Sequence, residues 1–475
     1  MENKTMIRLF EKLLLIVFIT NFNGQAMAQG VDDLQKIAAS QDGASPLFFK
    51  LNASKIPSIG PGTFYDEKEC TVRSGMANFL NKMQQQKQAT VAFIGGSITQ
   101  GNYCYRLQTA KYLQTVFPET QFKWINAGVS GTGTDLGAFR LKEQVLDYQP
   151  DLIFIEFAVN KAYAEGMEGM IRQIIKHNPK TTVCMIYTIL HGQTQHYQQG
   201  NTPENIQRLE KLADYYELPS IHLGMEAAAL EKEGALVWKA EKPEEGKILF
   251  SKDGIHPLQA GGDLYAAAIA RGFEKMKSQT ETFSHTLKQP LLSDKWEHAI
   301  MIDPSDVATF DKNWKQIQTN SLSYLKKFSN WFDHVAVAEH PGAGLTFSFK
   351  GDMFGLFDIG GPEVGQLEFE IDGKKVFLQR QSSSELIYYT VSETTGTQTI
   401  DRFNVFCNNR YRGQHDLIEL PYGEHTVKIT VSEDKADKKK ILGPRQSDDI
   451  TSHPEKYDRT AVYIGKILIR GELVK

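Results

Sequence analysis

From Thr90 to about Met276, short apolar runs alternate with longer amphipathic segments, and this alternation constrains the fold more than any other feature. The apolar runs are nearly continuous, as expected of strands buried on both faces of a sheet. They lie at 91–94, 122–126, 152–159, 182–190 and 220–223. Helical segments are expected between and after them, at 103–116, 134–148, 167–177, 203–216 and 258–276. The pattern predicts a parallel sheet covered by helices, a three-layer α/β/α domain at 89–277.

The pattern changes after Lys277. A polar stretch at 278–294 is typical of a linker, and alternating strand-like runs with turn residues between them follow it. These runs lie at 345–349, 365–371, 386–390, 425–431 and 461–469. They predict an antiparallel β-sandwich over 295–475. The N-terminal segment 29–88 has no clear pattern, and it is compatible with contributing strands to this second domain.

Length and composition indicate a multidomain globular protein. A chain of 475 residues exceeds the usual size of one domain, and 41% hydrophobic residues suffice for packed cores. The formal net charge is -4, so the chain lacks the excess of basic residues typical of nucleic-acid-binding proteins, and no nucleic-acid partner is expected. The oligomeric state cannot be inferred from these data.

The first 28 residues have the pattern of a signal peptide. Lys4, Arg8 and Lys12 precede the short apolar run at 13–19, and the small-x-small triplet Ala26-Met27-Ala28 follows it. The run is too short to span a bilayer, which needs roughly 20 apolar residues. We therefore expect cleavage before Gln29, no membrane span afterwards, and a periplasmic or extracellular location.

The chain has four cysteines, and none of them has C-x-x-C spacing. This spacing supports neither a zinc knuckle nor a thioredoxin-like site. Disulfides are compatible with the secretory route, but the sequence assigns no pairing.

A glycine-rich turn follows the first predicted strand, in Gly95-Gly96-Ser97-Ile98-Thr99. Two glycines permit a sharp turn that presents the Ser97 side chain at the carboxyl edge of the sheet. Taken alone, the motif is also compatible with an ordinary strand-to-helix turn. A phosphate-binding loop is disfavoured, because no Gly-Lys-Ser/Thr follows.

A second segment, Asp253-Gly-Ile-His256-Pro257, precedes the last long helix. Spacing of three residues in a turn can bring the Asp253 carboxylate beside the His256 imidazole and fix its tautomer. Pro257 restricts the backbone of His256 to extended conformations. Together with Ser97, these residues supply the nucleophile, the base and the orienting acid of acyl transfer.

Candidate oxyanion donors end the next two predicted strands. The segment from Asn126 to Gly131 follows the second strand, and Asn160 ends the third. Separately, Gly131 is compatible with a simple turn and Asn160 with a strand cap. Together with Ser97 they lie at three successive carboxyl ends, where open α/β sheets bind ligands.

The combination of Gly-Gly-Ser97-Ile-Thr, Asn126-x-Gly-x-Ser-Gly131, Asn160 and Asp253-x-x-His256 resembles the SGNH, or GDSL-like, hydrolase family over about 89–277. The resemblance implies a flavodoxin-like sheet, with Ser97 as nucleophile, His256 as base and Asp253 as its partner. It further implies an oxyanion hole made by the N–H groups of Ser97 and Gly131 and the Asn160 amide. Esterases, lipases, thioesterases and carbohydrate acetylesterases belong to this family, and we expect neither a metal nor another cofactor.

Two positions depart from the family pattern. The usual Gly-Asp-Ser is Gly95-Gly96-Ser97 here, which resembles a secreted bacterial branch beginning Gly-Gly-Ser-Ile-Thr. The oxyanion Asn is commonly followed by Asp, whereas Lys161 follows Asn160 here. A cation at this position is compatible with altered loop order or with attraction of an anionic substrate.

Three further residues are candidate substrate contacts. Arg140, in the helix after Gly131, has the charge to bind a substrate carboxylate, although a surface ion pair is an alternative. His191 follows the fourth predicted strand and so opens onto the site edge. Trp238 has the ring to stack on a sugar, but most tryptophans serve packing.

We interpret the chain as a secreted serine esterase that removes short acyl groups, acetyl above all, from an acylated glycan. The C-terminal domain resembles β-sandwich modules of carbohydrate esterases, with either a sugar-binding or a structural role. Alternatives are a lipid esterase or lysophospholipase, a non-catalytic glycan-binding protein with a decayed site, and an enzyme that transfers the acyl group to another sugar.

Overall fold

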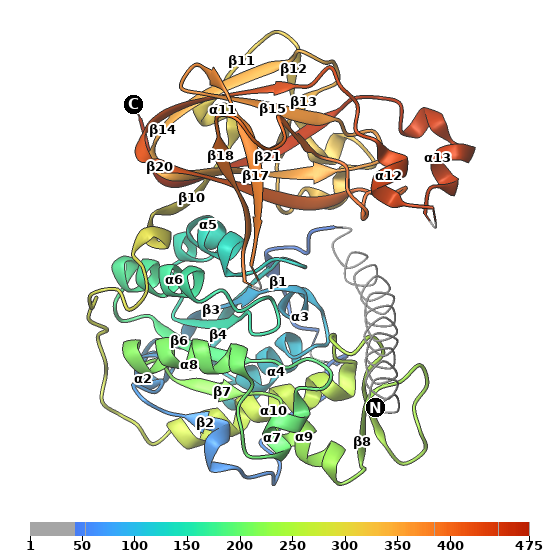
Figure 1. The fold of residues 1–475 in the computed structure, drawn as a ribbon. Helices are drawn as coiled ribbons and strands as arrows, with labels where there is room; N and C mark the ends of the chain where they lie inside the picture. Colours follow the sequence, from blue (N-terminus) through green and yellow to red (C-terminus); the bar gives the residue numbers. More distant parts are fainter. Residues whose placement is uncertain (1–42, 53, 384, 445, 475) are drawn as a thin grey trace, which may run out of the picture.

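The computed structural model describes residues 43–474 except 53, 384 and 445. The signal peptide predicted at 1–28 lies outside these residues. The chain forms two domains, with an all-β domain stacked on an α/β domain (Figure 1). Within the described part of the chain, no helix combines the length and apolar character needed to cross a membrane.

The α/β domain is built on five parallel strands, which match the five predicted runs. They are β3 (Gln88–Gly95), β4 (Gln121–Gly128), β5 (Leu152–Glu156), β6 (Thr182–Tyr187) and β7 (Ser220–His222). Their spatial order is β4-β3-β5-β6-β7. Counted from β3 as strand 1, this is the 2-1-3-4-5 order of flavodoxin-like folds. The strand order reverses between β3 and β5, because β4 pairs on one side of β3 and β5 on the other.

Helices cover both faces of this sheet, as predicted (Figure 1). Helix α4 packs against α10 on one face, and α6 packs against both α5 and α8 on the other. Their bounds are α4 (Arg106–Val116), α5 (Thr134–Gln144), α6 (Ala164–His177), α8 (Glu204–Tyr216) and α10 (Gln259–Met276). Shorter elements are α2 (Ala77–Gln86), α3 (Ser97–Gln100), α7 (Thr194–Gln198), α9 (Met225–Lys232), and the parallel pair β8 (Leu236–Lys239) and β9 (Ile248–Ser251).

The N-terminal segment joins the α/β sheet, so the expectation that 29–88 contributes strands to the second domain is wrong for the described residues. Strand β1 (Phe48–Phe49) pairs antiparallel with β4, and β2 (Cys70–Thr71) pairs antiparallel with β7. Each is only two residues long and lies at an outer edge. Short strands there cover the backbone groups that the parallel sheet leaves unpaired.

The C-terminal domain is a twelve-stranded sheet, antiparallel except where β18 meets β20. Its strands are β10 (Ala299–Ile302), β11 (Thr309–Phe310), β12 (Trp314–Gln318), β13 (His334–Ala338), β14 (Gly344–Gly360), β15 (Gln366–Ile371), β16 (Lys374–Lys375), β17 (Phe377–Ser382), β18 (Ile387–Ser392), β19 (Thr399–Asp401), β20 (Arg412–Val431) and β21 (Val462–Leu473). The short helices are α11 (Pro304–Val307), α12 (Lys438–Leu442) and α13 (Asp448–Ser452). The sheet encloses its own apolar core, as a β-sandwich does.

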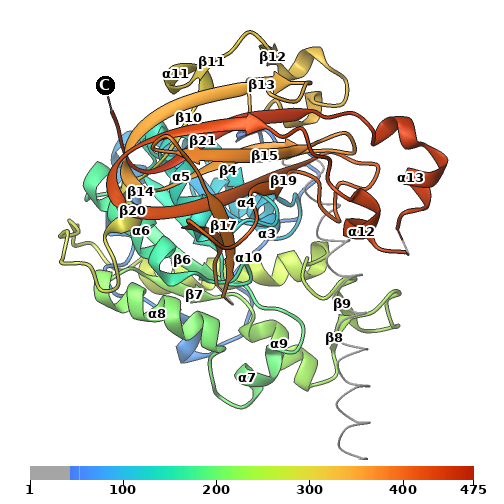
Figure 2. The same ribbon diagram turned by 45° about the horizontal axis from the view of Figure 1, so that its top comes forward.

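The long strand β14 contributes to two cores. Its side chains alternate between buried and half-buried up to Lys350, and every residue from Gly351 onward is buried. Phe347 and Phe354 point into the core of the β domain, whereas Met353 and Phe357 belong to the core shared with the α/β domain. The register shifts between Gly351 and Met353, where a bulge lets the strand bend. Figure 2 shows the long strands lying across the α/β domain.

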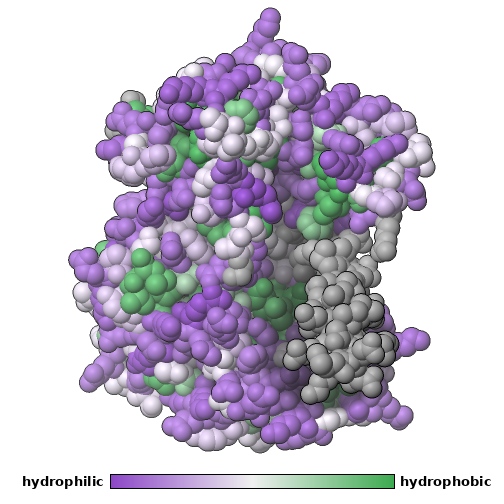
Figure 3. Space-filling view, in the orientation of Figure 1, coloured by the Kyte–Doolittle hydropathy of each residue, from purple (hydrophilic) through white to green (hydrophobic). Residues whose placement is uncertain are grey.

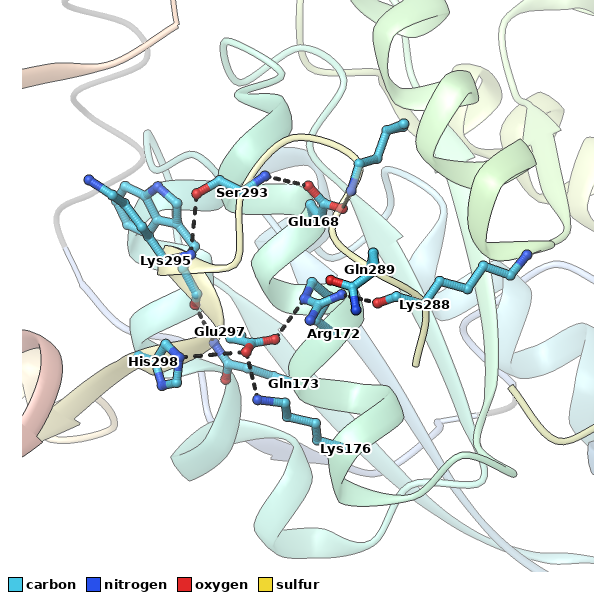
Figure 4. A network of polar contacts seen from close by, with 12 residues as sticks. Glu168, Arg172, Gln173, Lys176, Lys288, Gln289, Ser293, Lys295, Glu297 and His298 are labelled. Atoms are coloured by element: carbon cyan, nitrogen blue, oxygen red, sulfur yellow. Dashed lines mark hydrogen bonds and ion pairs between the residues drawn. The ribbon is translucent and has the colours of Figure 1, made fainter. Parts of the chain in front are cut away.

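The predicted linker is fixed to helix α6 rather than hanging free (Figure 4). The buried Glu168 carboxylate accepts three backbone N–H bonds from residues 291–293, at 2.5–2.9 Å. Arg172 donates to the Lys288 carbonyl at 2.6 Å and to Glu297 at 2.6 Å. These bonds set the position at which the chain enters the β domain.

Candidate active site

The turn after β3 holds Ser97 at the start of α3, at the carboxyl edge of the sheet. A side chain at either of the two preceding positions would crowd a neighbour. A Cβ on Gly95 would come within 2.5 Å of the Glu156 carbonyl oxygen, and one on Gly96 within 2.6 Å of Asn160 Cγ. The Ser97 residue is 6% exposed, so the tight turn places its hydroxyl in a recess.

Ser97, His256 and Asp253 form a continuous hydrogen-bonded chain. His256 Nε2 lies 2.7 Å from Ser97 Oγ, and His256 Nδ1 lies 2.6 Å from Asp253 Oδ2. An imidazole that donates its Nδ1–H to the carboxylate keeps Nε2 free to accept the serine proton. The structure thus brings together the three residues that the sequence pointed to from 159 positions apart.

The second oxygen of Asp253 is held by its own loop. Oδ1 accepts from the Ser251 hydroxyl and from the backbone N–H groups of Ile255 and His256, each at 2.9 Å. Burial alone would raise the pKa of the Asp253 carboxyl, but bonds from His256 and the backbone outweigh it and hold the pKa well below its usual range. Asp253 therefore stays ionised beside the imidazole at any pH near neutrality.

Trp238 supports this loop and does not face a substrate, which corrects the expectation of sugar stacking. The residue is 1% exposed, its ring stacks on Phe250 with centroids 3.9 Å apart, and its Nε1–H donates to the Gly254 carbonyl at 3.0 Å. His191 is exposed, and its backbone N–H donates to the same carbonyl at 2.9 Å. A substrate contact by His191 stays a prediction.

Asn160 and Gly131 lie beside the nucleophile turn. The Asn160 carboxamide packs directly against Gly96, and its backbone carbonyl lies near Gly133. Gly131 has φ +68°, a left-handed conformation that favours glycine, and is exposed. Both residues line the same cavity, and a role as oxyanion donors stays a prediction.

Gln100 joins the nucleophile helix to the loop that carries Gly131, a role that the sequence did not indicate. Its Oε1 accepts from the Ser130 backbone N–H at 2.8 Å and from the Ser130 hydroxyl at 2.5 Å. Its Nε2 donates to the Gly43 carbonyl at 2.9 Å. The buried side chain thereby holds α3 and the loop at 129–131 in one relative position.

Arg140 is fully buried, so the expectation that it binds a substrate carboxylate is wrong, and so is the alternative of a surface ion pair. Its guanidinium donates to the carbonyl oxygens of Ala127 and, at 2.9 Å, of Gly95, near the ends of β4 and β3. It also donates to Gln144 Oε1 at 2.8 Å. Burial lowers the pKa of Arg140 to about 9. The residue braces the sheet edge that carries the site.

Glu156 is a second buried ionisable group that the sequence analysis did not assign. It accepts the Thr188 hydroxyl at 2.6 Å and the Thr99 hydroxyl at 3.0 Å. Burial raises the pKa of this carboxyl, and the two threonine bonds oppose the rise. Through Thr99 it ties the nucleophile helix to the end of β5.

A cavity of about 530 Å³ opens beside these residues and is lined by both domains. Gly131, Asn160 and Lys161 line it from the α/β domain. From the other side, the β17–β18 hairpin reaches down onto the α/β domain (Figures 1 and 2), where Glu385 near its tip pairs with Arg208 of α8. The view in Figure 3 shows a mostly hydrophilic surface with small hydrophobic patches. The described residues contain no group of three His, Cys, Asp or Glu side chains able to hold a metal ion.

One family model matches part of the chain. Residues 93–264 match the model of the GDSL-like Lipase/Acylhydrolase family. The matched residues include the strands β5, β6 and β7 of the parallel sheet and the positions of Ser97, Asp253 and His256. The match lies within the α/β domain, over the region where the sequence resembles this family.

Solved structures share the two-domain architecture. A two-domain esterase active on acetylated mannans, co-crystallised with mannopentaose, aligns with a TM-score of 0.60 and 21% identity, over 86% of this chain and 99% of its own. A second structure of an esterase with that description aligns over 86% and 98%, again at 0.60 and 21%. The acetylxylan esterase Axe2 from Geobacillus stearothermophilus aligns over 40% of this chain and 97% of its own, at 0.30 and 22%. No curated protein matches the chain in sequence.

Proposed function

We propose that the protein is a serine esterase that removes acetyl groups from a glycan, with Ser97, His256 and Asp253 as its catalytic residues. The observation that carries the proposal is the hydrogen-bonded chain from Ser97 through His256 to Asp253, at 2.7 and 2.6 Å. A hydroxyl with an adjacent base, itself oriented by a carboxylate, is the arrangement that activates a serine.

The reaction follows an acyl-enzyme route. Ser97 Oγ attacks the acetyl carbonyl carbon while His256 Nε2 takes the hydroxyl proton, and Asp253 stabilises the imidazolium. The imidazolium then protonates the departing sugar oxygen as its bond to the carbonyl carbon breaks. Water, deprotonated by His256, attacks acetyl-Ser97, and the returned proton releases Ser97 and acetate.

Three groups are proposed to stabilise the oxyanion: the N–H of Ser97, the N–H of Gly131 and the carboxamide of Asn160. The contact of Asn160 with Gly96 and the bonds from Gln100 to Ser130 support this assignment, because they fix the donors relative to the nucleophile. Loss of one such donor typically costs about 10²–10³ in kcat.

The polar side chains that line the cavity support a carbohydrate acetyl ester over a long-chain lipid, and the rings of Trp331, Phe357 and Phe406 lie among them. Asn404, Gln414 and Arg412 line its far side, and an exposed cation, Lys161, lies beside Asn160. These are hydrogen-bonding groups, suited to hydroxyl-rich ligands. The likeness to an esterase active on acetylated mannans adds support through the shared two-domain fold. We also propose secretion, on the signal-peptide pattern of residues 1–28.

The test is a panel of p-nitrophenyl acetate, butyrate and octanoate with acetylated mannan and xylan, applied to the wild type, Ser97→Ala and His256→Ala. We expect acetate to be the preferred acyl group and both variants to lose at least about 10⁴-fold in kcat. Ser305→Ala, an exposed serine of the β domain, is the matched control and should retain wild-type rates.

Each alternative has its own signature in this panel. Full activity in Ser97→Ala would refute the mechanism, and preference for octanoate would indicate a lipid esterase. Binding of glycans by a wild type that hydrolyses no ester would indicate a non-catalytic protein. Transfer of acetyl to an added sugar faster than to water would indicate an acyltransferase.

A further inference from the structure

Three cationic side chains line the cavity beside Asn160: Lys161 of the α/β domain, and Arg380 and Arg412 of the β domain. Lys161 follows Asn160 directly, and Arg380 lies on strand β17 of the descending hairpin. Both side chains belong to exposed residues. Among the described residues, neither Lys161 nor Arg380 forms an ion pair.

The other charged side chains of the cavity are engaged within the protein. Asp135 Oδ2 lies 2.9 Å from His415 Nε2, and Asp416 pairs with the buried Arg402. Arg412 lies over the Phe406 ring, with Cζ 4.4 Å from its centroid. Lys161 and Arg380 thus form no ion pair among the described residues, although the Asp135 carboxylate acts on Lys161 electrostatically.

The backbone directs Lys161 toward the cavity. Lys161 and Ala162 have φ of +66° and +50°, which is uncommon for residues other than glycine. Ala162 is fully buried, so the chain turns inward there and leaves Lys161 at the surface. Removal of water by the surrounding protein lowers the pKa of Lys161; Asp135 opposes this shift, and the nearby Arg380 adds to it. Two like charges held close together are stabilised when an anion binds between them.

We propose that the preferred substrate is an acidic glycan, in which a uronate carboxylate near the acetyl ester binds between Lys161 and Arg380. This inference rests on the proposed esterase function. Because Lys161 adjoins Asn160, the carboxylate belongs to the acetylated sugar or to its neighbour. Arginine offers a planar pair of N–H donors to a carboxylate, and lysine supplies a compact charge.

The charge of the substrate can be changed without altering its backbone. Acetylated oligomers of galacturonate, glucuronate and mannuronate are compared with the same oligomers after methyl esterification of their carboxyl groups. We expect kcat/KM for the best oligouronide to exceed that of its methyl ester about tenfold, and 0.5 M NaCl to reduce the difference. An acetylated oligosaccharide with sulfate groups and no uronate shows whether sulfate substitutes for the carboxylate.

Charge-removing variants locate the effect. Lys161→Gln and Arg380→Gln should each reduce the ratio of rates on uronide and methyl ester, and the double variant should bring it close to one. Lys315→Gln removes an exposed lysine of β12 and should keep the wild-type ratio. Inhibition by the deacetylated oligouronide, measured on p-nitrophenyl acetate, supplies a readout for any variant with altered turnover, and melting curves identify misfolded ones.

The outcomes separate this inference from the function on which it rests. Hydrolysis of acetyl esters with equal kcat/KM for uronides and their methyl esters overturns the acidic-substrate inference alone. A preference that survives in the double variant refutes the role of Lys161 and Arg380, and a preference for sulfate refutes the uronate assignment. Hydrolysis of no acetylated substrate overturns the esterase function as well.

Discussion

The two sheets of this protein are buried in different ways. The parallel sheet of the α/β domain is covered on both faces by helices of its own domain, and its central strand β5 is buried at every residue. In the β domain, β14 and β21 contribute alternate side chains to an internal core and to the core shared with the α/β domain. The comparison teaches that an apolar pattern reports how many faces of a strand are covered, and not which part of the chain covers them.

Because of this difference, the catalytic residues depend on one domain and the neighbouring cavity depends on both. Ser97, His256 and Asp253 lie in the self-contained α/β domain, whereas the cavity beside them needs both domains. Changes at the first three residues should affect catalysis without moving the domains. Changes in the shared core should loosen the contact between the domains and leave the arrangement of Ser97, His256 and Asp253 intact.

The largest expected effect is that of Asp253→Asn. An amide beside His256 Nδ1 favours the wrong tautomer, so we expect kcat on p-nitrophenyl acetate to fall about 10⁴-fold. Asp306→Asn, at an exposed aspartate of α11, is the matched control. A loss below tenfold with an unchanged melting temperature would contradict the role of Asp253.

Phe357→Ala tests the shared core. The residue is 1% exposed and packs edge-on against Phe332, with centroids 4.7 Å apart, so its removal should cost about 3–5 kcal/mol of unfolding free energy. Phe347→Ala, the same change inside the β domain core, should cost a similar amount. Calorimetry should resolve two transitions only in Phe357→Ala, and identical single transitions in both variants would contradict the distinction.

The smallest effect concerns the bond between Asp135 and His415, which joins the two domains. Burial raises the pKa of Asp135, but His415 and a backbone N–H outweigh it and lower the pKa below its ordinary value. A lowered carboxyl pKa stabilises the protein above about pH 4, and this contribution is lost as the pH falls further. On going from pH 5 to pH 3, the wild type should lose about 1 kcal/mol more than Asp135→Asn in urea unfolding. Equal losses in both proteins would show that the bond contributes nothing.

Much of the α/β domain was predictable because its signals are local. Parallel strands buried on both faces appear as continuous apolar runs, and all five were placed correctly. The Ser97 turn and the Asp253–His256 spacing each lie within a few residues of sequence. We could expect the Ser97 turn and the Asp253–His256 segment to lie close together, because the carboxyl ends of parallel strands share one edge of the sheet.

The remaining features depend on contacts between distant segments. Strands β1 and β2 are two residues long and carry no periodicity, so their pairing with β4 and β7 had no sequence signal. Gln100, Arg140 and Glu156 are polar residues whose partners lie on other elements, and residue type alone suggested exposure. The sequence left Trp238 open between packing and sugar binding, because a large ring is compatible with both, and the structure shows that it packs.

The contact between Gly96 and Asn160 restricts how this site can be redesigned. An aspartate at position 96, the residue usual in the family, would place its Cβ where the Asn160 carboxamide lies. A consensus-based redesign that substitutes Gly96 singly should therefore displace Asn160 and lower activity, although it moves the motif closer to its relatives. Any redesign of position 96 therefore has to make room for, or reposition, the side chain at position 160.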